Sequence, residues 1–269
     1  MKISLHKNSF GLFDDTLSYA KMMEEIEKVK MENELNKNND KLNLKEIIQV
    51  DFPSDQYYRQ QTKKKQIVLH HTVSGQGVEG DIRWWKQTKS RIATPIIIDY
   101  KGNIFQCFST KYWGHHLGVK QKVFDGNGIT KTNNVILNKQ SIGVEIDSWG
   151  GLVKSKKYWY PAKWDAEKNK FVGDRNQKPV KNVQTYEKGY KGFYAFEKYT
   201  DEQIESLRKL IVYWNDVYNI PLNYNDDMWD VSLNALNGES GIWSHVSYRD
   251  DKSDCHPQPE LIEMLKSLK

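Results

Sequence analysis

Apolar and polar positions along the chain predict four strands between residues 66 and 147. Residues 67–69 form a short apolar run that continues into His70 and His71, and a glycine-containing loop follows. Such a run, bounded by turn residues, is typical of a buried strand. A hairpin is predicted over 94–107, with its turn at Lys-Gly-Asn, and a fourth strand over 141–147.

Helices are predicted where apolar residues recur at spacings of three and four. One is expected over 78–88. The most regular follows Thr200, which forms a capping box with Gln203. Pro259 is expected at the start of a last helix that reaches 268. Residues 233–242 are interpreted as a polar loop.

The domain organisation follows from changes in composition. Residues 1–50 are expected to form a helical N-terminal extension, with a second short helix over 42–50, and 51–65 a linker. The main domain is placed at 66–269, with an inserted, partly irregular region over about 150–198 that contains a hairpin. Alternating strands and helices favour an α/β (α+β) fold with a single central mixed β-sheet flanked by helices.

Composition narrows the class of protein. The 269 residues are enough for a sizeable core, and no apolar run approaches the ~20 residues of a membrane span. The first residues lack the apolar segment of a secretory signal, so we expect synthesis in the cytoplasm. Cys107 and Cys255 provide no disulfide framework; a reduced pair is expected, with a single bridge as the alternative.

Charge and aromatic content point weakly to a partner. The net charge of +5 favours an anionic partner, such as cell wall or nucleic acid. Nine Trp and fifteen Tyr are typical of carbohydrate or peptide grooves, although core and surface packing explains them equally well.

Two groups of residues that are far apart in the sequence contain the candidate catalytic side chains. The first histidine cluster is His70 and His71, and the second is His245 with Lys252, Asp254, Cys255 and His256. Catalytic zinc takes three protein ligands and leaves a fourth position open. His70, His245 and either Asp254 or Cys255 supply such a set. An amide hydrolase also needs a carboxylate to accept the proton of water and a cation to hold the developing oxyanion. Glu145 and Lys252 are the candidates for these two roles.

Four segments carry a resemblance to a known family. These are IVLHHT (67–72), WGHHLG (113–118), SIGVEI (141–146) and HVSYRDDKSD (245–254). In this order the chain resembles, over about 64–267, the zinc-dependent N-acetylmuramoyl-L-alanine amidases that share a fold with peptidoglycan recognition proteins and phage lysozyme-like amidases. The first 60 residues and the 150–198 insertion lie outside the resemblance.

The resemblance implies roles for individual residues. It implies that His70 and His245 are ligands of Zn²⁺ and that Glu145 is the general base. The lysine that the family has two positions before its last ligand corresponds to Lys252. The spacing from that lysine selects Asp254 as third ligand, with Cys255 as its rival.

Three further residues are predicted to bind substrate. The resemblance implies this role for His116. His71, one step along the strand, tends to point away from the metal, so a structural role is also open for it. Thr94 occupies a position where some relatives have a catalytic tyrosine.

The resemblance therefore implies a zinc amidase that cleaves the bond between the lactyl group of N-acetylmuramic acid and L-alanine. Peptidoglycan rather than nucleic acid is the expected partner, and a phage endolysin that acts on the wall after release is the expected setting. The alternative is a non-catalytic peptidoglycan-binding or regulatory protein on the same fold, which has no need of all five catalytic and metal-ligating residues.

Overall fold

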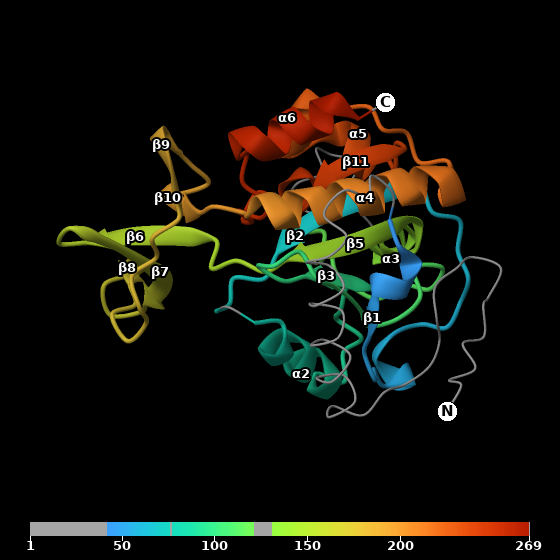
Figure 1. Cartoon of the computed structure of the whole chain (residues 1–269), viewed down its shortest axis with the longest axis horizontal. Helices are drawn as coiled ribbons and strands as arrows, with labels where there is room; N and C mark the ends of the chain where they lie inside the picture. The colour runs from blue at the N-terminus through green and yellow to red at the C-terminus, as the bar shows by residue number, and fades with distance from the viewer. Residues whose placement is uncertain (1–41, 76, 121–130, 269) are drawn as a thin grey trace.

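The computed structural model describes residues 42–75, 77–120 and 131–268. Its main body is a six-stranded mixed sheet in the order β1-β4-β3-β5-β2-β11 (Figure 1). All neighbouring strands are parallel except β3 and β4, which form the predicted antiparallel hairpin. The strands of this central sheet are β1 (Ile48–Gln49), β2 (Gln66–His71), β3 (Ile96–Ile98), β4 (Ile104–Gln106), β5 (Ser141–Ile146) and β11 (Gly241–Ser244).

Helices cover both faces of the central sheet. In Figure 1, α4 and α6 lie on one side of the strands and α2 on the other. The helices are α2 (Glu79–Gln87), α3 (Lys131–Gln140), α4 (Asp201–Tyr218), α5 (Leu233–Leu236) and α6 (Pro259–Ser267). The predicted fold class, a central mixed sheet flanked by helices, is thereby confirmed. None of the helices in the described ranges is long and apolar enough to cross a membrane.

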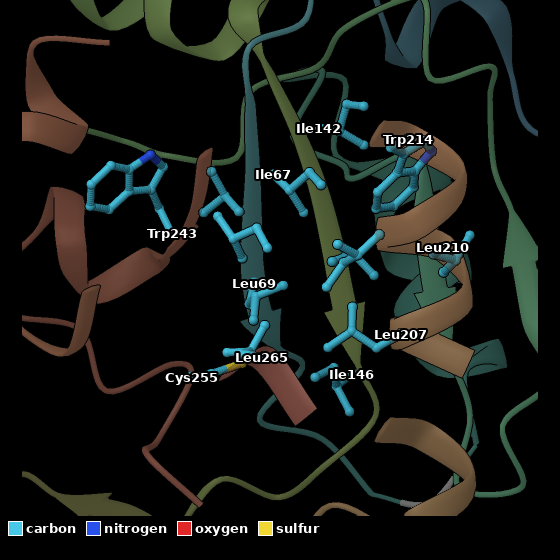
Figure 2. Close-up of a cluster of buried hydrophobic side chains, with 14 of the residues drawn as sticks. Ile67, Leu69, Ile142, Ile146, Leu207, Leu210, Trp214, Trp243, Cys255 and Leu265 are labelled. Atoms are coloured by element: carbon cyan, nitrogen blue, oxygen red, sulfur yellow. The ribbon is translucent and has the colours of Figure 1, made fainter. Parts of the chain in front are cut away.

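Helix α4 forms as its sequence predicts and supplies much of the core. The Thr200 hydroxyl accepts a hydrogen bond from the backbone N–H of Gln203. The side-chain oxygen of Gln203 accepts one from the backbone N–H of Thr200, which completes the capping box. Figure 2 shows Leu207, Leu210 and Trp214 of this helix directed at the strands. All three are at most 1% exposed, and each such buried side chain stabilises the fold by about 1.5–3 kcal/mol.

The register of the strands decides which side chains share a face. His70 of β2 lies opposite Glu145 of β5, and Glu145 lies opposite Ile97 of β3. Because side chains alternate along a strand, their neighbours Leu69 and Val144 point to the other face, into the core beneath α4. The histidine and the glutamate are thus brought together on the face opposite α4.

A second sheet, which the sequence reading did not predict, occupies most of the 150–198 region. It is antiparallel, in the order β8-β7-β6-β10-β9, and lies at one end of the molecule (Figure 1). Its strands are β6 (Gly151–Ser155), β7 (Tyr158–Asp165), β8 (Lys170–Gly173), β9 (Val183–Tyr190) and β10 (Phe193–Glu197). The expectation of a partly irregular region is therefore wrong, since these residues form regular hairpins.

Two local predictions also need correction. Residues 42–50 do not form a helix: a single 3₁₀ turn, η1 (Leu44–Glu46), leads into β1, which pairs with β4 at the edge of the central sheet. The supposed polar loop over 233–242 contains α5 and begins β11. The helix predicted before residue 42 lies outside the described residues.

Candidate active site

Strand β11 joins the two histidine clusters. It pairs in parallel with β2, Ser244 opposite Leu69, so that His245 follows directly beside His70. The two imidazole rings lie 4.4 Å apart, centroid to centroid. A tight turn after β11, η5 (His245–Tyr248), starts the loop that returns Asp254 to the same place.

Three ligand atoms converge at this point. Oδ2 of Asp254 lies 2.8 Å from Nδ1 of His245 and 3.2 Å from Nδ1 of His70. All three side chains are buried, at 2–7% exposure. Among the described residues this is the group of histidine, cysteine and carboxylate side chains with the spacing of a metal site. The structure thus brings together the predicted set with Asp254.

Hydrogen bonds on the far side of each ring fix its tautomer. Nε2 of His245 lies 2.8 Å from the carbonyl oxygen of Leu117, which can only accept, so this nitrogen carries the proton. The Nδ1 atom of the same ring faces Asp254. Metal-binding histidines are held by a partner on their second nitrogen in this way.

The tautomer of His70 follows from a series of hydrogen bonds that runs through Ser141 and His116. The Ser141 hydroxyl donates to the Leu137 carbonyl, so it accepts from Nε2 of His116 at 2.8 Å. Nδ1 of His116 is then free to accept from Nε2 of His70, 2.9 Å away. The Nδ1 atom of His70 is left unprotonated and faces Asp254.

Burial and mutual contact set the charges of the site. Burial, with the neighbouring His245, lowers the pKa of His70 to about 4, so its ring is neutral at physiological pH. Burial alone raises the pKa of Asp254, but the two histidines hold that pKa well below its usual range. Two imidazole nitrogens and an ionised carboxylate oxygen form a donor set that fits a divalent cation.

Cys255 points away from this set. Its side chain is fully buried and lies in the apolar cluster with Leu265 (Figure 2). Burial raises the pKa of its thiol well above the usual value, although a hydrogen bond with Tyr199 opposes the shift. Both described cysteines are free, so the alternative of a bridge to Cys107 is not realised.

Glu145 extends toward the same region from β5. Its Oε2 atom is shielded from solvent and has no hydrogen-bond partner among the described residues. Burial raises the pKa of Glu145 well above its ordinary value, and Asp254 and Asp81 add to the shift. The half-buried Lys252 is close enough to lower that pKa. A buried carboxyl group with a raised pKa is suited to accept and return a proton.

The three predicted substrate-binding residues lie in different surroundings. His116 adjoins the ligand group through its contact with His70, and its ring lies against Gly143. Thr94 is buried beside the same glycine, and its hydroxyl donates to the Ile96 carbonyl.

His71 lies on the other face of β2 from His70. Its Nδ1 atom is 2.8 Å from the Tyr199 hydroxyl, and a side chain at Gly150 would collide with the ring. The expectation that His71 points away from the metal is confirmed, and its surroundings are those of a packed core residue.

Residues that orient the site were missed by the sequence reading. Ser141 and the carbonyl oxygen of Leu117 set the histidine tautomers, and the Asn138 side chain accepts from the backbone of His116. Backbone carbonyls leave no trace in a sequence. Ser141 does lie within the SIGVEI segment, which is the signal that could have drawn attention to it.

Comparison with known proteins places the chain in a family. The family described as N-acetylmuramoyl-L-alanine amidase matches residues 60–259. No curated protein sequence matches.

Several solved structures resemble the chain at low identity. PlyL is 14% identical, with 82% of this chain and 96% of that chain covered and a TM-score of 0.42. The PlyG catalytic domain is 15% identical, with 82% and 93% covered and a TM-score of 0.43. The hydrolase AmiA of Staphylococcus aureus is 12% identical, with 95% and 92% covered and a TM-score of 0.42. The family match spans most of the sequence, and by it the chain belongs to the N-acetylmuramoyl-L-alanine amidase family.

Proposed function

We propose that the protein is a zinc-dependent amidase that hydrolyses the amide bond between the lactyl group of N-acetylmuramic acid and L-alanine in peptidoglycan. Membership of the amidase family supports the reaction class. The observation that carries the proposal is the convergence of His70 Nδ1 and His245 Nδ1 on Oδ2 of Asp254.

These three residues would hold the metal. Two imidazole nitrogens and one carboxylate oxygen are the donor types of catalytic zinc sites. A zinc ion bound there supplies Lewis acidity, which lowers the pKa of water and polarises a carbonyl group. His116 would orient His70 through the Nε2–Nδ1 hydrogen bond and border the bound substrate.

Glu145 is proposed as the general base and acid. Its partnerless Oε2 atom accepts a proton from the water that attacks the amide carbon. The same carboxyl group returns the proton to the alanine nitrogen as the C–N bond breaks. The products are a lactyl carboxylate and a free L-alanine amino group.

Lys252 is proposed to stabilise the oxyanion. Its charge lowers the pKa values of both Glu145 and His70, so it lies near the proposed base and one proposed metal ligand. A positioned positive charge lowers the barrier as negative charge develops on the carbonyl oxygen. Thr94, buried beside His116, is proposed to shape the substrate side of the site rather than to donate to substrate.

Digestion of purified peptidoglycan tests the activity. The zinc-loaded protein should release new L-alanine amino termini, and treatment with a chelator should abolish this until zinc is restored. Glu145→Gln keeps the size of the side chain but removes the base, and should lower the rate by about 10²–10⁴-fold. If the zinc-loaded wild type binds peptidoglycan but yields no termini, the non-catalytic binding protein replaces the amidase.

Zinc binding, measured by calorimetry and metal analysis, tests the ligand set independently of activity. Asp254→Ala should weaken zinc binding by more than about a hundredfold, since it removes a direct ligand. Cys255→Ala should leave zinc affinity within about threefold, because the thiol is packed away from the site. The reverse ranking would make Cys255 the ligand.

We further propose the setting of a phage endolysin, with residues before the central sheet as an accessory extension. Expression inside a bacterium should cause lysis only when a pore-forming protein permeabilises the membrane. Failure to lyse under those conditions, by an enzyme that digests the same wall in vitro, would argue against this setting. Removal of residues 1–41 should leave hydrolysis by the purified enzyme unchanged.

A further inference from the structure

The second sheet carries the positive charge of the protein. Between residues 151 and 197 there are eleven of the 40 Lys and Arg residues and five of the 35 Asp and Glu residues. This segment therefore has a formal charge of +6, and the rest of the chain has −1. A cationic face of this kind attracts an anionic partner.

A cavity of about 550 Å³ lies within this sheet. Strands β6, β7 and β8 and the start of β10 line it. Its walls are dominated by five aromatic side chains, Trp159, Trp164, Phe171, Phe193 and Tyr194. Aromatic walls of this kind suit a ligand that presents flat apolar faces.

The aromatic residues at the mouth of the cavity are exposed but held in place. Trp164, Phe171 and Tyr194 are 51%, 46% and 64% exposed. The rings of Trp164 and Phe171 lie 5.2 Å apart, and those of Phe171 and Phe193 5.0 Å. Exposed rings fixed by mutual contact form a preorganised surface, which lowers the entropy cost of binding.

Two lysines complete the cavity. Lys154 and Lys170 line it, and neither forms an ion pair with another described residue. Nζ of Lys154 lies 5.6 Å from the centre of the Trp159 ring. Both ammonium groups are thus free of an ion-pair partner among the described residues, and that of Lys154 lies beside an aromatic wall.

We propose that this cavity binds a glycan strand of the cell wall from which the stem peptides have been removed. Pyranose rings present apolar C–H faces, which stack on Trp164 and Phe171. The free lactyl carboxylates of the muramic acid residues pair with Lys154 and Lys170. The inference rests on the proposed function, because that hydrolysis leaves one such carboxylate for each bond cut.

The cavity is tied to the catalytic loop. Phe193 lies 5.6 Å from Phe196, and Phe196 stacks on His256 at 4.7 Å. His256 follows Asp254 by two positions, and its Nδ1 atom accepts from the Tyr186 hydroxyl at 2.7 Å. A stripped strand held on the second sheet therefore keeps the enzyme beside wall in which cleavage has begun.

Binding to defined polymers tests the proposal. The full-length protein with Glu145→Gln serves as background, so that no cleavage occurs during the measurement. It is titrated with soluble strands stripped by an unrelated amidase, with the same strands after conversion of their carboxyl groups to amides, and with polyglycerol phosphate.

Three variants are compared in that background. Trp164→Ala should weaken binding of stripped strands at least about tenfold, because a stacking surface is lost. Lys154→Gln with Lys170→Gln should remove the preference for charged over amidated strands. Tyr158→Ala is the matched control, since Tyr158 is 47% exposed on β7 but does not line the cavity, and should bind as the background does.

The outcomes separate this proposal from the proposed function. Equal binding by the Trp164→Ala and control proteins, or binding of polyglycerol phosphate in preference to the glycan, would overturn it. Equal affinity for charged and amidated strands would do the same. Cleavage of a small soluble muramyl peptide tests the amidase separately, and Trp164→Ala alone should leave that rate unchanged.

Discussion

The strands of the central sheet and those of the second sheet differ most in burial. All six residues of β2 are buried, whereas only Pro161 is buried among the eight of β7. The central sheet is enclosed by helices on both faces and holds the proposed catalytic groups. The second sheet presents lysines and aromatic rings to solvent. One region thus holds its side chains in a fixed geometry, and the other has an exposed surface, which is the proposed contact with a polymer.

The largest expected effect is a loss in the free energy of unfolding, which should differ between the two sheets. Leu69→Ala in β2 removes a fully buried side chain and should lower the free energy of unfolding by about 2–5 kcal/mol. Phe171→Ala in β8 should lower it by less than about 1 kcal/mol, because that ring is 46% exposed. Denaturant unfolding of both variants measures the difference. Equal losses would show that the second sheet is as much a part of the core as the first.

Acidification should also act through the central sheet. Burial lowers the pKa of His71 from 6.5 to about 4 in the folded protein. Between these values the unfolded chain takes up a proton that the folded chain does not. The free energy of unfolding should therefore fall by about 3 kcal/mol as the pH drops from 6.5 to 4.

His71→Leu provides the control for this pH dependence. The variant lacks the titrating ring, so its stability should fall less steeply over the same window. The measurement is denaturant unfolding of chelator-treated protein between pH 4 and 7.5. An identical slope for variant and wild type would assign the dependence to other groups.

A single added methyl group should disturb the site from within β5. In Gly143→Ala the new Cβ would lie 2.7 Å from Cγ2 of Thr94 and 2.9 Å from Nδ1 of His116. We expect a loss of about 1–3 kcal/mol in stability and about tenfold weaker zinc binding, since His116 orients His70. Gly80→Ala, with no atom within 4 Å of the new Cβ and a helical position, should bind zinc normally. Normal zinc binding by Gly143→Ala would remove His116 from the support of the ligand.

The smallest effect is expected for charge changes on the second sheet. Lys154→Gln with Lys170→Gln should shift the free energy of unfolding by less than about 0.5 kcal/mol, because neither lysine forms an ion pair with a described residue. Thermal unfolding at low and high salt measures this. A larger loss at low salt would mean that these lysines stabilise the fold instead of facing a ligand.

Burial also explains which elements could be predicted from sequence. Residues 67–69 form an apolar run and 142–146 are mostly apolar because both faces of their strands are covered, so the pattern and the strand coincide. Strands β7 and β9 have no buried face, so their sequences lack the alternation of apolar and polar residues that marks a half-buried strand. Strand β11 is only four residues long and follows a polar segment, so it was missed.

The candidate site was predictable in its parts but not in its assembly. His70, His245 and Asp254 could be named from residue type and spacing, and the structure brings them together. The spacing from Lys252 favoured Asp254 over Cys255, but the direction of these two adjacent side chains is seen only in the structure. The Leu117 carbonyl and the Ser141 hydroxyl accept hydrogen bonds from the histidine rings. These bonds depend on tertiary contacts, so they could not be predicted from the sequence.

The pairing of β11 with β2 has a consequence for the timing of activity. It places two of the proposed ligands, His245 and Asp254, next to the third, His70. Contacts so distant in sequence close late, since a long loop must be ordered before they form. A ribosome-bound chain cannot assemble the ligand group until residue 254 has emerged from the exit tunnel. Chains truncated before residue 254 should therefore be inert, and the proposed hydrolysis should begin only after the loop that carries Asp254 has folded beside β2.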